Sequence, residues 1–205
     1  VVTDGKSMAG IGILYGNGNG TFQAPLILGD GVPYEYGLTV GDINADGDID
    51  IVVGNSNLKQ LQIYKNTGTG TRFTGSFDVV ALNNLDGTRQ GDVILADIDN
   101  DGDKDVVIGT ENVSAFEVYT NDGSGTFSYA TAGGTGSGHG GKAMTVFDYT
   151  GDGWKDIIIA DENQNQIQAY RNDGAGNFGS IDYTFVSTNP YSVNVTDLNN
   201  DGIYE

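Results

Sequence analysis

The chain of 205 residues contains no cysteine, three prolines, one histidine and only nine lysines and arginines against 28 acidic residues. Without cysteine, neither disulfide bonds nor thiolate metal sites can form. No apolar run approaches the roughly 18 residues that a membrane-spanning helix needs. The formal charge of −19 argues against nucleic acid and against an anionic membrane surface as partners, because both require a basic surface.

Signatures of catalysis are also scarce. The sequence has no Gly-x-Ser-x-Gly elbow and no zinc-type histidine cluster. His139 lies alone in the glycine-rich segment 133–142, where a histidine is usually solvated. The segment GNGNG (16–20) lacks the lysine and the following helix of a phosphate loop, and it reads better as a hairpin turn. We therefore expect a protein that is not an enzyme.

The chain is rich in glycine, with 33 residues, and one nine-residue motif occurs in it four times. The copies, here called loops 1 to 4, are DINADGDID (42–50), DIDNDGDKD (97–105), DYTGDGWKD (148–156) and DLNNDGIYE (197–205). Each places oxygen-bearing side chains at positions 1, 3, 5 and 9 and a glycine at position 6. Alternate residues of a tight loop can face a common centre, and carboxylates packed this closely repel one another unless a cation lies between them.

We expect each loop to bind one Ca²⁺ through these four side chains and the backbone carbonyl at position 7. An EF-hand is excluded because position 12 of loops 1 to 3 is Val53, Ile108 or Ile159 rather than glutamate and the flanks are predicted strands. The predicted ligands are Asp42, Asn44, Asp46, Asp48 and Asp50; Asp97, Asp99, Asp101, Asp103 and Asp105; Asp148, Thr150, Asp152, Trp154 and Asp156; and Asp197, Asn199, Asp201, Ile203 and Glu205.

The four loops differ in their expected affinity. Loop 2 has four carboxylates and should bind most tightly, whereas loop 3 is weakened by the neutral Thr150 and the nearby Lys155. Loop 4 ends on the longer Glu205 beside a chain end, so we expect three to four ions in total. All-oxygen ligands with several carboxylates suit calcium better than magnesium. Loops of this kind in extracellular modules bind at about 10⁻⁴ to 10⁻³ M, which favours a secreted or cell-surface location and predicts that chelation lowers the melting temperature.

The loops start 55, 51 and 49 residues apart, a period typical of stacked or radially arranged repeats. Alternating apolar residues precede each loop, and short β-branched runs follow loops 1 to 3. A glycine turn between aromatic residues then recurs, in the copies Tyr15…Asn17-Gly18…Gly20…Phe22, Tyr64…Asn66…Gly68…Gly70…Phe73, Tyr119…Asn121…Gly123…Gly125…Phe127 and Tyr170…Asn172…Gly174…Gly176…Phe178. Four antiparallel strands per period predict an all-β fold, a β-propeller of about four four-stranded blades. We expect residues 1–205 to form a single such domain.

The path from Asp197 through the C-terminus and round to Asp42 covers one more period. The sequence therefore favours a ring closed by pairing of both termini, which would remove exposed sheet edges. The alternative is a segment of a larger propeller.

The Asp-x-Asp/Asn-x-Asp-Gly-x-x-Asp loops, followed by the Tyr…Asn-Asp-Gly-x-Gly-x-Phe turns, resemble FG-GAP/VCBS repeats. These repeats are the blades of integrin alpha-subunit propellers and of many bacterial surface proteins. The resemblance covers essentially the whole chain and implies a calcium-binding propeller at the cell surface. The family's usual rings have seven or eight blades, so four repeats depart from its pattern.

Three classes of function follow. We favour a non-catalytic binding or adhesion module that recognises carbohydrate or a protein partner. A polysaccharide-cleaving, lyase-type enzyme or its accessory domain is the second, and a structural spacer of a surface protein is the third. Candidate ligand-stacking residues are Trp154, Tyr34, Tyr36 and Tyr191; the alternative is that these rings pack between blades.

Overall fold

The structure is a computed structural model of the 205-residue chain. It describes residues 2–3, 10–29, 35–56, 58–68, 73, 75–81, 90–110, 114–134, 143–186 and 188–199. Throughout this part the regular structure is β, and no helix long and apolar enough to cross a membrane is found there. The all-β fold expected from the sequence is confirmed.

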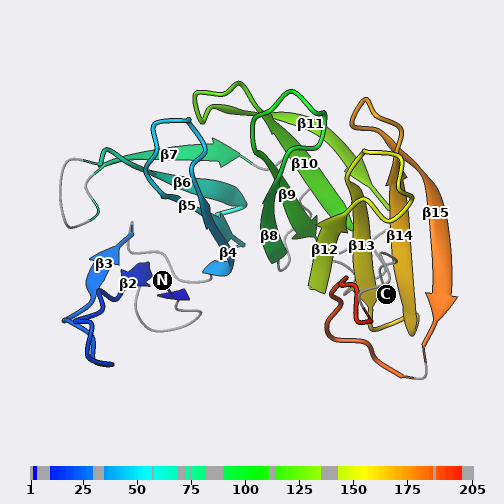
Figure 1. Cartoon of the computed structure of the whole chain (residues 1–205), viewed down its shortest axis with the longest axis horizontal. Coiled ribbons are helices and arrows are strands. Elements are labelled where there is room, and N and C mark those ends of the chain that lie inside the picture. The colour runs from blue at the N-terminus through cyan, green and yellow to red at the C-terminus, as the bar shows by residue number, and fades with distance from the viewer. Residues whose placement is uncertain are drawn as a thin grey trace.

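The described strands form four antiparallel sheets, numbered here along the chain (Figure 1). The first sheet has the order β1-β2-β3, and the others have the orders β4-β5-β6-β7, β8-β9-β10-β11 and β12-β13-β14-β15. The strands are β1 (Val2–Thr3), β2 (Ile11–Ile13), β3 (Leu26–Leu28), β4 (Glu35–Gly41), β5 (Asp50–Asn55), β6 (Gln60–Asn66), β7 (Gly75–Ala81), β8 (Gln90–Ala96), β9 (Asp105–Thr110), β10 (Phe116–Asn121), β11 (Phe127–Gly133), β12 (Ala143–Phe147), β13 (Asp156–Asp161), β14 (Gln166–Asn172) and β15 (Phe178–Phe185). Neighbouring strands in each sheet are consecutive in sequence, as in a propeller blade.

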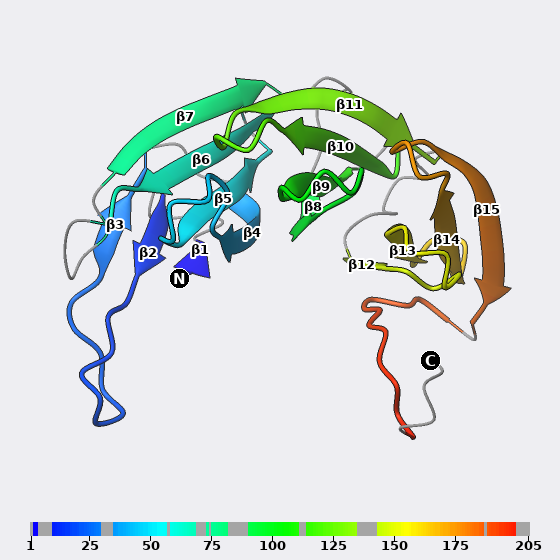
Figure 2. The same ribbon diagram turned by 45° about the horizontal axis from the view of Figure 1, so that its top comes forward.

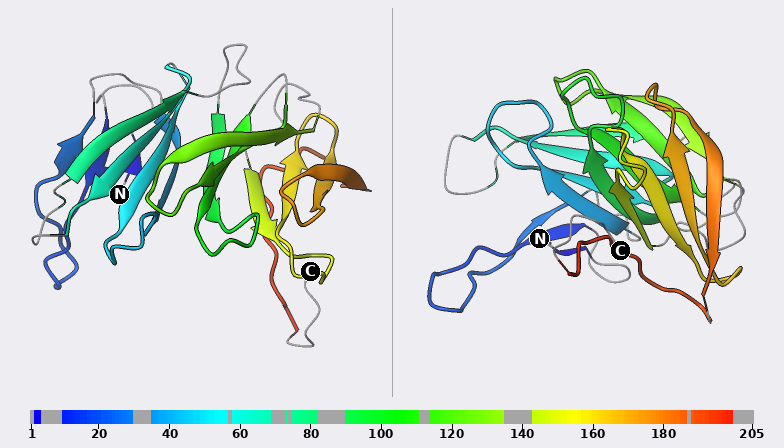
Figure 3. Two further views of the ribbon diagram at one scale, coloured as in Figure 1. Left: turned by 90° about the horizontal axis from the view of Figure 1, so that it is seen from above. Right: turned by 45° about the vertical axis from the view of Figure 1, so that its right-hand side comes forward.

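The four sheets stand side by side along an arc (Figure 2). The strands β4, β8 and β12 line its inner side and contact one another in order, whereas β7, β11 and β15 form the outer rim. Seen from above, the sheets follow one another along the molecule with their strands inclined to one another (Figure 3). Loops 1 to 3 each join an inner strand to the next strand, at one end of the sheets (Figure 1).

The runs after loops 1 to 3 form β5, β9 and β13, in which every residue is buried. Their β-branched side chains suit a pleated strand that is covered on both faces. The fourth strand that the predicted four-stranded blade requires follows the glycine turn as β7, β11 and β15. The sequence thus predicted these elements correctly.

Three hydrophobic cores lie between the sheets rather than within one of them. Ile11 and Ile13 of the first sheet pack with Ile51 and Tyr64 of the second. The two other cores are built in the same way: Ile43, Val52, Leu61 and Ile63 meet Val106, Ile108, Tyr119 and Phe127, while Ile98, Val107, Phe116 and Val118 meet Met144, Ile157, Ile159, Tyr170 and Phe178. Each sheet therefore depends on its neighbours for burial.

The closed four-bladed ring favoured by the sequence is not formed by the described residues. In the first sheet β1 and β3 pair only with β2. Residues 188–199 contain no strand, although Val193 and Val195 alternate as in the strands before loops 1 to 3. The sheets form an open arc, because the pairing between the termini that closure requires is absent from this part of the chain.

Candidate metal centres

Loops 1 to 3 share one backbone conformation. The residue at position 4 is left-handed in each, with φ of 57° at Ala45, 58° at Asn100 and 73° at Gly151. The glycine at position 6 follows with φ of 89° to 99°, namely at Gly47, Gly102 and Gly153. Two left-handed residues within three positions wind the chain tightly, and glycine adopts this conformation without the steric cost that other residues meet.

Two carboxylates of each loop fix this winding through backbone N–H groups. At position 1, Oδ2 of Asp42, Asp97 and Asp148 accepts the N–H of the position 6 glycine at 3.0, 3.2 and 2.8 Å. At position 5, Oδ1 of Asp46, Asp101 and Asp152 accepts the N–H of position 7 at 2.9 Å in all three loops. The acidic side chains are thus held inside the loop by bonds that recur from sheet to sheet.

The aspartate at position 9 is the first residue of the following strand and links three segments. Asp105 Oδ2 accepts the N–H of Ile98 at 2.8 Å, and its Oδ1 accepts the N–H of Asn121 at 2.9 Å. Asp50 and Asp156 make the same pair of bonds, to Ile43 and Asn66 and to Tyr149 and Asn172. Position 9 therefore ties each loop to the glycine turn of its own sheet.

Loop 2 has the arrangement best suited to a cation. Ligand oxygens of Asp97, Asp99 and Asp105 lie within 4.8 Å of one another, and this is the one such acidic group found in the part of the chain that the structure describes. Oδ1 of Asp97 is buried without a hydrogen-bond partner. A buried carboxylate oxygen without a partner is costly unless a donor or a cation satisfies it, so these residues fit a divalent ion.

The electrostatics of loop 2 point the same way. Burial raises the pKa of Asp105 to about 6, although the N–H groups of Asn121 and Ile98 lower it. Burial also raises the pKa of Asp99, and the neighbouring carboxylate of Asp101 raises it further. The loop thus concentrates carboxylates in a place where their charge is unfavourable. A bound cation would reverse that balance.

Loops 1 and 3 depart from this arrangement. In loop 1, the Nδ2 group of Asn44 donates to Asp46 Oδ2 at 2.9 Å, so an amide occupies one carboxylate oxygen. In loop 3, Asp148 Oδ1 accepts the N–H groups of Gly151 and Asp152 at 2.7 and 3.1 Å. Thr150 bonds to Asp156 Oδ2 through its hydroxyl at 3.3 Å. Burial raises the pKa of Asp50 and of Asp156 as well.

Loop 4 lies largely outside the described residues, which include Asp197 and Asn199 but not Asp201, Ile203 or Glu205. The N–H of Asn199 donates to Asp197 Oδ1 at 3.2 Å, as the N–H of Asn44 donates to Asp42 Oδ1 at 3.3 Å in loop 1. His139 and Tyr34 also lie outside the described residues, as does the side chain of Tyr36.

Trp154 and Tyr191, the two predicted aromatic residues whose side chains the structure describes, belong to different segments of the chain. Trp154 belongs to loop 3, where its half-buried indole lies over Gly174; a Cβ added to that glycine would stand 2.5 Å from the ring. Tyr36 lies near the start of β4, at the end of the strand away from loop 1. Tyr191 is 72% exposed, in the segment after β15.

Sequence reasoning placed the asparagines that end β6, β10 and β14 in the glycine turns and missed their bonds to the acidic loops. Asn121 and Asn172 are buried and bond both to their own loop and to the loop of the preceding sheet. Their signal was available: an asparagine follows the position 9 aspartate by 16 residues in all three copies, at Asn66, Asn121 and Asn172.

Comparison with known proteins places these loops in a family. The family model described as FG-GAP-like repeat matches residues 42–108, 97–159 and 148–205, each match beginning at position 1 of a loop. These overlapping matches cover most of the chain, which therefore belongs to the FG-GAP-like repeat family. This confirms the resemblance drawn from the motifs.

A solved structure of an Agrocybe aegerita lectin, described as the basis of specific recognition of non-reducing terminal N-acetylglucosamine, is similar to this protein. The TM-score is 0.58 and the sequence identity 26%, over 90% of this chain. The chain spans 48% of the length of that lectin chain. No curated protein sequence matches.

Proposed function

We propose that this protein is a calcium-stabilised, extracellular binding module that recognises carbohydrate and has no catalytic activity of its own. The observation that carries the proposal is the similarity, over nine tenths of the chain, to a lectin that recognises a terminal N-acetylglucosamine. Membership in the FG-GAP-like repeat family is in keeping with a binding role. A protein partner is the alternative within the same class.

Calcium is the proposed cofactor, and its role is structural. The support is the buried, unpartnered Oδ1 of Asp97 and the close approach of Asp97, Asp99 and Asp105. Asp101 and the carbonyl of Asp103 complete the expected oxygen set. A bound ion neutralises the clustered carboxylates and thereby stabilises the fold. Ca²⁺ affinities of about 10⁻⁴ to 10⁻³ M, usual for extracellular modules, suit a location outside the cell.

Exposed aromatic rings are the proposed sugar contacts, because an aromatic face provides flat apolar area for a sugar ring. Tyr191 is the most exposed of the candidates whose side chains the structure describes. Trp154 offers less of its ring, since one part packs over Gly174. We therefore assign Tyr191 the larger share of binding.

The test is a glycan array, including glycans with terminal N-acetylglucosamine, probed in millimolar calcium and again in excess EDTA. We expect binding in calcium and a large loss in EDTA. Tyr191→Ala should weaken binding severalfold. Tyr129→Ala, which removes an exposed tyrosine on β11, is the matched control and should leave it unchanged. A folded, calcium-loaded protein that binds no glycan would refute the carbohydrate proposal.

A further inference from the structure

The buried asparagines at the ends of β10 and β14 connect the acidic loops of adjacent sheets. Nδ2 of Asn121 donates to the carbonyl of Ile43 in loop 1 at 2.8 Å and to that of Lys104 in loop 2 at 3.1 Å. Asn172 repeats this geometry one sheet further on, with the carbonyls of Ile98 at 2.8 Å and Lys155 at 3.1 Å. Each amide therefore spans two neighbouring loops.

The remaining polar atoms of these asparagines are also engaged. The backbone N–H of Asn121 donates to Asp105 Oδ1, and its Oδ1 accepts the N–H groups of Gly123 and Gly125 at 3.2 and 3.0 Å. Asn172 makes the corresponding bonds to Asp156, Gly174 and Gly176. Because both residues are buried, these bonds lie in a low-dielectric setting and fix one orientation of the side chain.

The isoleucine at position 2 completes the connection. Ile43 accepts from Asn121 at its carbonyl and donates its own N–H to Asp50 Oδ2 at 3.1 Å. Ile98 does the same between Asn172 and Asp105. A continuous series of hydrogen bonds therefore joins the position 9 aspartates of three loops, in the order Asp50, Ile43, Asn121, Asp105, Ile98, Asn172 and Asp156.

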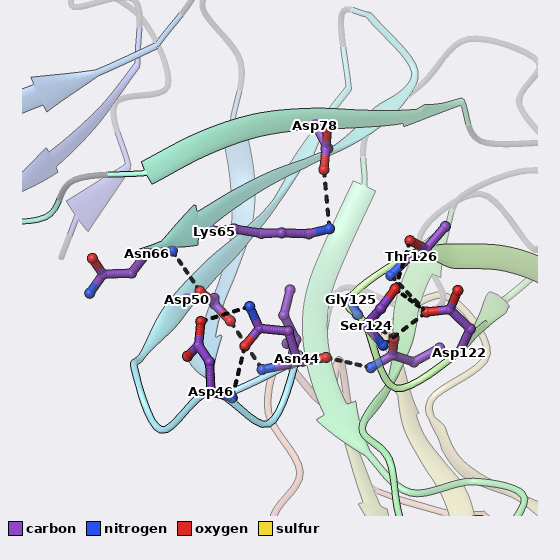
Figure 4. A network of polar contacts seen from close by, with 12 residues as sticks. Asn44, Asp46, Asp50, Lys65, Asn66, Asp78, Asp122, Ser124, Gly125 and Thr126 are labelled. Carbon is purple, nitrogen blue, oxygen red and sulfur yellow. Dashed lines mark hydrogen bonds and ion pairs between the residues drawn. The ribbon is translucent and has the colours of Figure 1, made fainter. Parts of the chain in front are cut away.

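Packing holds the series in place. Ile43 and Ile98 are buried in the cores between sheets. A Cβ added to Gly125 would stand 3.2 Å from Cγ1 of Ile43, so the turn of the third sheet fits closely against loop 1. Figure 4 shows this approach, with Asn44, Asp46 and Asp50 of loop 1 facing the turn that contains Asp122, Ser124 and Thr126.

We propose that cation binding is coupled between adjacent loops, with Asn121 linking loop 1 to loop 2 and Asn172 linking loop 2 to loop 3. This rests on the proposed calcium role. Ordering one loop for its ion fixes the position 9 carboxylate and, through the asparagine, the backbone of the neighbouring loop. The neighbour then loses less conformational entropy when it binds, which is positive cooperativity. Asn121 and Asn172 are positioning residues in this account.

The link between loops 1 and 2 is the better one to break. Loops 2 and 3 have a second connection, because Nδ2 of Asn100 donates to the carbonyl of Gly153 at 3.3 Å. The corresponding position in loop 1 is Ala45, whose side chain has no such donor. Asn121→Asp keeps the oxygen that accepts the glycine N–H groups and removes the amide donor to Ile43.

The test is hydrogen exchange of peptides that cover each loop, followed along a calcium titration. Disabling loop 2 with Asp97→Asn should raise the calcium midpoints of loops 1 and 3 at least threefold. When Asn121→Asp is also present, Asp97→Asn should no longer raise the calcium midpoint of loop 1, whereas it should still raise that of loop 3. Asn17→Asp adds the same charge in the exposed turn of the first sheet, outside the loops, and should leave the rise in both midpoints unchanged. Asn121→Ala, which adds no charge, should act as Asn121→Asp does.

The possible results separate the two proposals. In one outcome, calcium protects all three loops from exchange while Asp97→Asn still raises the loop 1 midpoint in the Asn121 variants. That result would overturn the coupling but not the calcium role. An absence of calcium protection in the wild-type chain would overturn the proposed calcium role and the coupling together. Loss of the loop 1 response alone in the Asn121 variants supports both.

Discussion

In loop 2 the carboxylates at positions 9 and 1 differ in how fully they are hydrogen-bonded. Asp105 accepts backbone N–H groups on both oxygens and is fully buried at the start of β9. Its neighbour Asp97 has one oxygen bonded to Gly102 and the other buried without a partner. A carboxylate bonded on both oxygens and one with a single unpartnered oxygen thus lie side by side, as expected where an ion is needed to complete the site.

The raised pKa of Asp105 predicts opposite pH responses with and without calcium. Without metal, the folded state takes up a proton near pH 6 and the unfolded state near pH 4. The folded state is therefore the one that binds more protons between these values, and the metal-free protein gains stability as the pH falls through this window. Calcium needs the ionised carboxylate, so the calcium-loaded protein loses stability over the same window.

Calorimetric melting temperatures at pH 7, 6 and 5, in EDTA and in calcium, provide the measurement. In EDTA the melting temperature should rise from pH 7 to pH 5, and in calcium it should fall. Asp105→Asn is the control, because it removes the group whose pKa is raised to about 6 and should make the EDTA profile less steep. A metal-free wild-type protein that becomes less stable from pH 7 to pH 5 would contradict this assignment.

Among the elements, the acidic loop and the glycine turn of the same sheet form one unit. Gly68, Gly123 and Gly174 are each left-handed and lie against the residue at position 7 of the loop, which is Asp48, Asp103 or Trp154. In loop 3 the contact is an indole ring, which cannot move aside as a carboxylate can. The only tryptophan in the chain therefore reports directly on this contact.

Gly174→Ala should destabilise the protein more than Gly176→Ala. Both residues have positive φ, 84° and 74°, so both substitutions carry a backbone cost of about 1–2 kcal/mol. Only Gly174 has the Trp154 ring within reach of an added Cβ; nothing lies within 4 Å at Gly176. Urea denaturation should show the larger loss in the free energy of unfolding for Gly174→Ala. Tryptophan emission should shift to the red in Gly174→Ala and not in Gly176→Ala. Equal losses with unchanged emission would show that the ring does not depend on this glycine.

The sequence predicted the elements that are determined by residues close together in the chain. The strands after the loops follow from β-branched runs such as Val106-Val107-Ile108, and the loops follow from their spacing. The turn of the first sheet was aligned one residue out: Gly16 pairs with Phe22 as Asn121 pairs with Phe127, so Asn17 corresponds to Asp122. The contact of Asn121 with Ile43 joins residues 78 apart and different sheets, and no local pattern contains it.

At the scale of the whole molecule, the sheets are stabilised pairwise. Three cores connect four sheets, and the hydrogen bonds of Asn121 and Asn172 cross two of these interfaces. An array of this kind is stabilised by the sum of its units and their nearest-neighbour contacts. The contribution of a side chain to the free energy of unfolding should therefore depend on whether a neighbouring sheet covers it.

Phe22 and Phe127 test this directly, because they hold the same place in their turns. Phe127 is 6% exposed in the core between the second and third sheets, whereas Phe22 is 64% exposed in the first sheet. Phe127→Ala should cost about 3–5 kcal/mol, the usual range for a buried phenylalanine. Phe22→Ala should change stability by less than about 0.5 kcal/mol, as surface substitutions do. Urea denaturation of both variants in calcium gives the comparison. Similar losses would mean that a further surface covers Phe22 in solution, and the arc would then not describe the complete set of contacts between sheets.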